Sequence, residues 1–105
     1  MALAAAQASH RPVLMGSWAT WCESCIELEK ETLAHPKVAA ELKRHFITVK
    51  VDCTRKDARV KKIKSDWAVK DLPTLVLVSP EGKRLRNLVG KVSPGELLEA
   101  LQAVK

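Results

Sequence analysis

Two cysteines separated by two residues are the strongest chemical signal in this chain. Cys22 and Cys25 enclose Glu23 and Ser24, between a short apolar segment and a run of helix-forming residues. We therefore expect them at a strand-to-helix junction, where the unpaired N–H groups of the helix stabilise a thiolate. Cys22 is then the nucleophile, and Cys25, one turn later, can resolve a mixed disulfide formed on it. A purely structural disulfide, or two inert buried thiols, is the alternative interpretation.

The third cysteine, Cys53, has no partner that the sequence identifies. A small buried residue at a strand end is the simpler interpretation, and a regulatory thiol is the alternative. Three is an odd number, which argues against a disulfide-stapled miniprotein, and there is no second closely spaced pair for a four-cysteine zinc site. None of His10, His35 and His45 stands at a recognisable ligand spacing, so we expect no metal.

Length and composition indicate one folded domain. The 105 residues are 47% apolar and 29% charged with few glycines and prolines, which excludes collagen-like and low-complexity classes and favours a folded chain over a disordered one. The alanine-rich start is neither a membrane span nor a signal peptide by composition. A domain excised from a longer protein would look the same. We assign residues 1–105 to a single domain and expect residues 1–10 to be the end of a helix or an expression remnant.

The net charge of +6 raises the question of nucleic acid, which the position of the charges argues against. Seven arginines and lysines lie between residues 55 and 70. Val60, Ile63 and Trp67 recur among them at helical spacing, so one amphipathic helix with a solvated basic face explains the pattern. Aromatic residues do not alternate with the basic ones. We expect no nucleic-acid partner.

The elements that must position the cysteines follow from periodicity and from turn residues. A buried strand begins at Val13, and a helix from Glu23 is interrupted at His35-Pro36, where Pro36 either kinks it or starts the next helix. Residues 46–51 are a β-branched strand, and about 57–68 are the amphipathic helix.

The last third of the chain predicts a hairpin and a helix. The turn Ser79-Pro80-Glu81-Gly82 folds the strand 74–78 back on about 84–89 with a bulge. Ser93-Pro94-Gly95-Glu96 is a capping box that begins the final helix, whose apolar stripe is Leu97, Leu98, Leu101 and Val104. The order predicts an α/β fold in which a parallel strand–helix–strand unit meets an antiparallel hairpin.

These motifs together resemble the thioredoxin superfamily. The resemblance rests on Trp18-Ala19-Thr20-Trp21-Cys22-Glu23-Ser24-Cys25, Leu72-Pro73-Thr74 and Val89-Gly90. More narrowly, the chain from about Arg11 to Val104 is similar to the C-terminal periplasmic domain of the thiol:disulfide interchange protein DsbD. That similarity adds Arg11-Pro12-Val13, Leu28-Glu29-Lys30, His35-Pro36-Lys37-Val38, Thr54 and Asp57-Ala58. The implied fold is a central mixed sheet flanked by helices.

The resemblance also implies roles for residues around the cysteine pair. Pro73 is expected to be cis and to lie beside the disulfide, with the backbone of Leu72 pairing with the substrate chain. Trp21 is expected as a partly exposed platform, whereas Trp18 is expected in the core. Substrate contacts are assigned to Trp21, Leu72 and the two residues between the cysteines, Glu23 and Ser24.

One position departs from the family pattern. The family places an acid six residues before the first cysteine, where this chain has Gly16. Glu29 matches a second acidic position of the DsbD domain and is a candidate proton acceptor, and a solvated helix glutamate is the alternative. Lys50 either approaches the site from the neighbouring strand or is an exposed edge residue.

The function that these observations favour is a protein-disulfide reductase or electron-relay domain. Cys22 and Cys25 would exchange disulfides with protein partners through transient mixed disulfides, without any metal or organic cofactor. The DsbD resemblance implies a membrane-embedded electron donor, a periplasmic or other extracytoplasmic setting, and a monomer. A free-standing thioredoxin-like reductase or oxidase, with a cytoplasmic setting, and a non-catalytic thioredoxin-fold adaptor are the alternatives.

The charges around the pair favour the reducing direction. Glu23, Glu27 and Glu29 place negative charge near Cys22 and partly offset the helix dipole. A strong oxidant depends on an unusually stabilised thiolate, so this sequence predicts a reductant instead.

Overall fold

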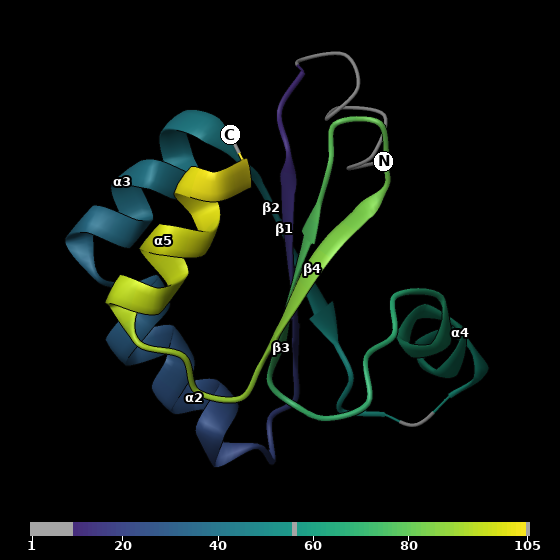
Figure 1. Ribbon diagram of the computed structural model, residues 1–105. Coiled ribbons are helices and arrows are strands. Elements are labelled where there is room, and N and C mark those ends of the chain that lie inside the picture. Colours follow the sequence, from purple (N-terminus) through teal and green to yellow (C-terminus); the bar gives the residue numbers. More distant parts are fainter. Residues whose placement is uncertain (1–9, 56, 105) are drawn as a thin grey trace.

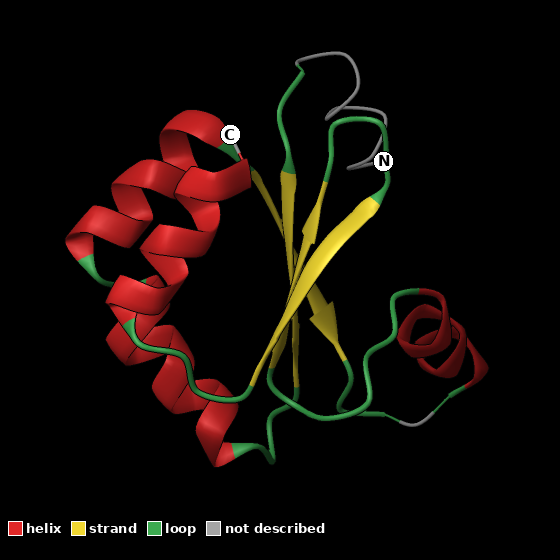
Figure 2. Ribbon diagram, viewed as in Figure 1, coloured by secondary structure: helices red, strands yellow, loops and turns green. Residues whose placement is uncertain are grey.

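The computed structural model describes residues 10–55 and 57–104 of the chain. The expectation for residues 1–10 therefore lies, apart from His10, outside the described residues. The elements follow in the order β1 (Val13–Trp18), α2 (Glu23–Leu28), η1 (Glu29–Leu33), α3 (Pro36–His45), β2 (Ile47–Asp52), α4 (Ala58–Asp66), β3 (Thr74–Val78), β4 (Arg84–Val89) and α5 (Pro94–Val104). Figure 1 shows this order by colour, and Figure 2 separates helices from strands.

A four-stranded mixed sheet forms the centre, in the order β2-β1-β3-β4. β1 pairs in parallel with β2, and β3 pairs antiparallel with both β1 and β4. The predicted strand–helix–strand unit and the predicted hairpin are thus both confirmed. The hairpin also contains the expected irregularity, because its register shifts between Leu77 and Val78.

The helices cover the two faces unequally. α2, α3 and α5 lie together on one face of the sheet, and α4 lies alone on the other (Figure 1). Alternation along the strands matches this arrangement: Leu14 and Leu75 point into the larger cluster under the three helices, whereas Val13 and Val76 belong to the smaller cluster on the α4 face.

α4 is amphipathic, as predicted, yet it packs loosely. None of its residues is buried. Its apolar side chains Val60 and Ile63, together with Trp67 just beyond it, border a cavity of about 570 Å³ against Val13 and Met15 of β1. Asp57 caps the helix by accepting the Val60 N–H at 2.9 Å.

The helical segment after the cysteines contains a feature that its sequence did not predict. α2 continues directly into a π-helix, η1, in which the Thr32 hydroxyl is buried and donates to the Val92 carbonyl at 2.7 Å. Pro36 starts a new helix instead of kinking the first, and the His35 ring accepts the Lys37 N–H. The capping residue of the last helix is also confirmed, since Ser93 Oγ accepts the Glu96 N–H at 3.2 Å.

Candidate functional site

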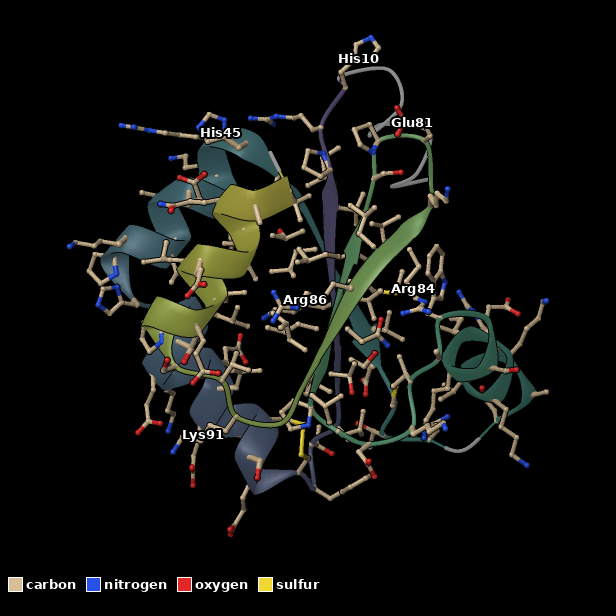
Figure 3. The ribbon with its side chains drawn as sticks, in the orientation of Figure 1. His10, His45, Glu81, Arg84, Arg86 and Lys91 are labelled. Carbon is tan, nitrogen blue, oxygen red and sulfur yellow. A yellow bond between two sulfur atoms is a disulfide. The ribbon has the colours of Figure 1, made fainter. Side chains whose placement is uncertain are left out.

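The cysteine pair occupies the N-terminus of α2, as the sequence predicted. Cys22 is the N-cap residue, and its Sγ accepts the backbone N–H of Cys25 at 3.2 Å. The two sulfurs form a disulfide with a Cα–Cα distance of 5.3 Å, which Figure 3 shows as a yellow bond where α2 begins. Cys22 is 8% exposed and Cys25 6% exposed, so position at the helix end, and not exposure, distinguishes them in this oxidised state.

Apolar residues surround the disulfide. Ala19 is buried with both cysteines, and Trp18 and Leu72 pack against the three. Trp18 is only half-buried, so the expectation of a core residue is only partly met. The ring packs beside the disulfide at the end of β1 and not in either of the two clusters on the faces of the sheet. The Leu72–Pro73 bond is cis, as expected. Pro73 is buried, and its carbonyl accepts the Gly90 N–H at 2.9 Å.

Glu29 and Lys50 form an ion pair beside the inner cysteine. Their side chains are 53% and 62% exposed, yet both line a small cavity of about 30 Å³ whose wall also includes Cys25, Gly16 and Pro73. Lys50 therefore combines the two interpretations left open by the sequence, because it is an exposed edge residue that also approaches the site. A Cβ atom added at Gly16 would meet Leu75 at 3.5 Å, an ordinary contact.

The remaining charges along this helical segment are mostly compensated. Lys91 forms ion pairs with both Glu27 and Glu31 at 2.8 Å, and the pKa of Lys91 is raised by these two carboxylates. Figure 3 shows Lys91 beside the α2 end of the molecule. Glu23 and Ser24 are exposed between the cysteines. The repulsion that we expected from three glutamates therefore rests mainly on Glu23, since Glu27 and Glu29 have lysine partners.

A hydrogen-bonded turn after β2 holds the segment before Cys22. Thr54 Oγ1 accepts the backbone N–H of Thr20 at 3.1 Å, and the Trp21 indole N–H donates to the Thr54 carbonyl at 3.3 Å. Asp52 accepts both the hydroxyl and the N–H of Thr54, and these bonds lower the pKa of Asp52. Trp21 itself is 60% exposed, as a platform would be.

Sequence reasoning did not assign this role to Asp52 and Thr54. From the sequence, Thr54 was identified only as one of the positions similar to the C-terminal domain of DsbD. A threonine two residues after an aspartate at a strand end is a signal for such a turn, but the contact with Trp21 depends on the parallel register of β1 and β2.

Cys53 is buried at the end of β2, and its thiol contacts the Val51 carbonyl at 3.7 Å. Burial raises the pKa of this thiol, although the nearby Lys64 opposes the effect. Cys53 also lines a groove with Trp21 and Leu72. The interpretation as a small buried residue describes its position.

The described residues contain neither a metal-binding cluster nor a membrane-spanning helix. Within residues 10–55 and 57–104, no group of three or more histidine, cysteine, aspartate or glutamate side chains could hold a metal ion. Within the same ranges, none of the helices has the length and apolar character needed to cross a membrane.

Comparison with known proteins gives consistent results. The family described as "Thioredoxin-like domain" matches residues 1–105. The chain is 35% identical to the thiol:disulfide interchange protein DsbD 2 of Pseudomonas aeruginosa, over 98% of this chain and 18% of that protein. It is 34% identical to DsbD of Vibrio vulnificus, over 97% of this chain and 17% of that protein. The chain thus spans less than a fifth of these relatives.

Solved structures show the same fold. A thioredoxin from Thermus thermophilus superposes with a TM-score of 0.84 at 25% identity, covering 98% of this chain and 80% of that one. The C-terminal domain of Neisseria meningitidis DsbD in its oxidised form has a TM-score of 0.82 at 23% identity, covering 97% of this chain and 91% of that one.

Proposed function

The chain belongs to the thioredoxin-like domain family, and on that premise we propose that it is a thiol-disulfide oxidoreductase that reduces protein disulfides. The observation that carries the proposal is the Cys22–Cys25 disulfide at the N-terminus of α2, with Cys22 Sγ already accepting a helix N–H. That position stabilises negative charge on the sulfur that must become the thiolate.

The reaction is a two-electron exchange between dithiol and disulfide. In the reduced protein, the Cys22 thiolate attacks one sulfur of a client disulfide, forms a mixed disulfide and releases the other client sulfur as a thiolate, which takes up a proton. Cys25 then loses its proton and attacks Cys22 Sγ. The Cys22–Cys25 disulfide forms, the second client sulfur leaves as a thiolate, and two electrons have passed to the client. A partner dithiol restores the starting state.

We propose Glu29 as the acceptor of the Cys25 proton. Cys25 and Glu29 stand four residues apart on the helical segment, and both line the cavity of about 30 Å³. A water molecule needs roughly 10–15 Å³ of such space, so one could connect the thiol with the carboxylate. Lys50 pairs with Glu29 and lines the same cavity, so the ion pair holds the carboxylate beside Cys25.

The client surface is proposed to surround the nucleophile. Trp21 supplies an exposed apolar platform, Glu23 and Ser24 are accessible between the cysteines, and Leu72 packs against the disulfide from the Pro73 loop. Pro73 closes the same small cavity behind Cys25. We assign these residues to client binding and, for Pro73, to the shape of the catalytic pocket.

The similarity to DsbD suggests the wider setting. We propose that residues 1–105 act as one electron-relay domain that receives electrons from a membrane-embedded partner, in the periplasm or on another extracytoplasmic side, and that the domain is a monomer. A free-standing thioredoxin-like reductase is the second candidate, because the superposition with the Thermus thermophilus thioredoxin is equally good. A longer reading frame with hydrophobic spans before residue 1 would favour the relay.

Catalysed reduction of insulin by dithiothreitol tests the activity. Wild-type protein should accelerate the reaction, and Cys22→Ala should abolish the acceleration. Cys25→Ala should instead accumulate mixed disulfides, because the resolving thiol is gone. Absence of both effects would leave only the adaptor interpretation. Peptide mapping with iodoacetamide should find Cys22 modified before Cys25 in the reduced protein, and the reverse order would exchange their roles.

The direction of electron flow is tested by equilibration with glutathione. A reductant should have a potential nearer to thioredoxin's roughly −270 mV than to DsbA's roughly −120 mV. A value more oxidising than about −180 mV would contradict the reductase assignment.

The role of Glu29 is tested separately from that of the cysteines. Glu29→Gln should slow release of the client from the mixed disulfide by up to about a hundredfold and should change the pH profile of that step. Glu29→Asp should restore part of the rate. Glu99→Gln, on the exposed side of α5, serves as the control. Equal release rates in the Gln variant and the wild type would return Glu29 to an ordinary surface residue.

A further inference from the structure

A groove of about 490 Å³ lies beside the cysteine pair, between α4 and the loop that carries Leu72. It is separate from the small cavity behind Cys25. Its lining consists of Trp21, Cys53, Val60, Lys61, Lys64, Lys70, Asp71 and Leu72. We call this surface the lysine groove.

Two residues that line the lysine groove adjoin the reacting cysteine. Trp21 directly precedes Cys22 in the chain, and Leu72 packs against the cluster that contains both cysteines. A segment bound in the groove would therefore lie next to the nucleophile. Its natural source is the polypeptide whose disulfide Cys22 attacks, because that polypeptide is held at the same place during the reaction.

The charge of the groove is strongly asymmetric. Three lysines face one carboxylate, Asp71. The ion pairs found within the described residues use Lys50, Lys62 and Lys91, and none of them includes a lysine of the groove. Lys62, a neighbour on the same helix, is compensated by Asp66, whereas Lys61, Lys64 and Lys70 keep their charge available.

The groove also has apolar walls. Trp21, Val60 and Leu72 line it together with the lysines. Lys64 is half-buried, and its charge acts on the buried Cys53 thiol. A ligand in the groove would thus meet positive charge beside apolar surface, a combination that suits carboxylate side chains on an extended chain.

We infer that the lysine groove binds an acidic, extended segment of the client protein next to the disulfide that Cys22 attacks. This inference rests on the proposed reductase function and adds a substrate preference to it. Aspartate and glutamate side chains of the segment pair with Lys61, Lys64 and Lys70, while its backbone passes Trp21 and Leu72. The groove then selects clients by the charge next to their disulfide.

Three disulfide-bonded peptides test the preference. All three have the same length and the same position of the disulfide-bonded cysteine. The residues flanking that cysteine are acidic in the first peptide, uncharged in the second and basic in the third. The reduced wild-type protein should reduce the acidic peptide in a single turnover with a second-order rate constant about tenfold above that for the basic peptide at low ionic strength. Added salt should shrink this ratio, because it screens exposed charges.

A matched pair of triple variants locates the effect. For each variant, the rates with the acidic and basic peptides are divided by its rate with the uncharged peptide. In Lys61→Gln/Lys64→Gln/Lys70→Gln the ratio of the acidic rate to the basic rate should fall close to one. Lys37→Gln/Lys43→Gln/Lys83→Gln changes the net charge equally at exposed positions outside the groove and should keep the wild-type ratio. Equal losses in both triple variants would assign the effect to net charge and overturn the inference.

The outcomes separate the inference from the proposed function. Failure to reduce even the uncharged peptide contradicts the reductase function. Reduction of all three peptides at one rate retains that function and rejects the groove as an acidic-client site. Inhibition by a single-stranded oligonucleotide, without any preference among the peptides, would assign the lysines to nucleic acid and overturn the inference.

Discussion

Thr54 connects two strand ends at the point where the reactive segment leaves the sheet. The Thr54 hydroxyl accepts the Thr20 N–H, and the Thr54 carbonyl accepts the Trp21 indole N–H. The Asp52 carboxylate in turn accepts the N–H and the hydroxyl of Thr54. The exposed platform beside Cys22 is thus fixed by a residue that lies 33 positions from Trp21 in the sequence. We regard Thr54 as a positioning residue for Trp21.

Thr54→Val should loosen that platform. The variant loses the hydrogen bonds made through Oγ1 and keeps the shape of the side chain, so the free energy of unfolding should fall by about 1 kcal/mol. Fluorescence anisotropy of Trp21, in a Trp18→Phe/Trp67→Phe background, should fall as the indole gains mobility. Thr48→Val, at an exposed position of β2, is the control. An unchanged anisotropy in Thr54→Val would mean that the carbonyl bond alone holds the ring.

Cys53 should make the free energy of unfolding fall as the pH becomes alkaline. Burial raises the pKa of its thiol above the ordinary 9.0, so the unfolded chain loses this proton first as the pH rises. The contribution is fully present below about pH 9 and is lost as the pH passes through the folded-state pKa. Urea unfolding of the oxidised protein between neutral and alkaline pH measures it, because only Cys53 is then a free thiol.

The difference between wild type and Cys53→Ala isolates that contribution from the titrating lysines. The variant should be less stable at neutral pH, since a buried side chain is truncated, and it should lose less stability on going to alkaline pH. Parallel curves for the two proteins would show that the Cys53 thiol ionises equally easily in both states.

At the scale of elements, α4 is held at its end more than along its length. The Asn87 side chain of β4 donates to the carbonyls of Trp67 and Ala68, at 3.1 and 3.2 Å. Ala68 has a φ of 57°, in the left-handed region that costs an L-residue energy. The last turn of α4 therefore ends in a conformation that glycine adopts more easily.

Ala68→Gly should stabilise the protein, even though glycine usually destabilises. The gain in the free energy of unfolding should be roughly 0.5–1 kcal/mol, because relief of the left-handed strain exceeds the added entropy of the unfolded chain. Ala39→Gly at an exposed position inside α3 is the matched control and should lose about 0.5–1 kcal/mol. Chemical denaturation measures both changes, and the same sign in both variants would contradict this account of Ala68.

The elements also show which signals a sequence contains. The strands, the hairpin bulge and the Ser93 cap were predictable because they depend on neighbouring residues. The π-helix was not, since Thr32 donates to a carbonyl 60 residues away. Lys91 and Glu27 form an ion pair although they are 64 residues apart in the sequence. The neutralisation of Glu27 near Cys22 therefore could not be predicted from neighbouring residues either. For the site, the spacing of residues predicted the cysteine pair, and the resemblance to the thioredoxin superfamily implied cis-Pro73, but neither indicated the Asp52–Thr54 turn.

At the scale of the whole molecule, the two faces of the sheet differ in how firmly they are covered. The face under α2, α3 and α5 contains the larger apolar cluster, whereas α4 has no buried residue and borders a large cavity. Local opening requires less energy where few apolar contacts are lost. The lysine groove is therefore bordered on one side by α4, the helix that should open most easily.

Hydrogen exchange should reveal this difference. Amides of β1, β3 and α5 should exchange only through global unfolding, and those of α4 should exchange faster through local opening. Mass spectrometry of short peptides from a deuterated sample resolves the segments. Protection of α4 equal to that of α5 would contradict the inferred mobility. Reduced exchange of α4 in the presence of the acidic peptide would fit its place beside the lysine groove.

The two edge strands of the sheet affect how readily the folded protein aggregates at high concentration. β2 and β4 are the outer strands, and each presents exposed basic side chains, Lys50 on β2 and both Arg84 and Arg86 on β4. Figure 3 labels the two arginines along β4. Two copies that approached edge to edge would have to bury these charged side chains or bring the arginines of β4 together, which discourages the strand pairing that starts aggregation. Replacement of Lys50 by an apolar residue would remove the partner of the Glu29 carboxylate and expose an apolar side chain at the β2 edge. It should therefore promote aggregation of the folded protein in addition to any loss of activity.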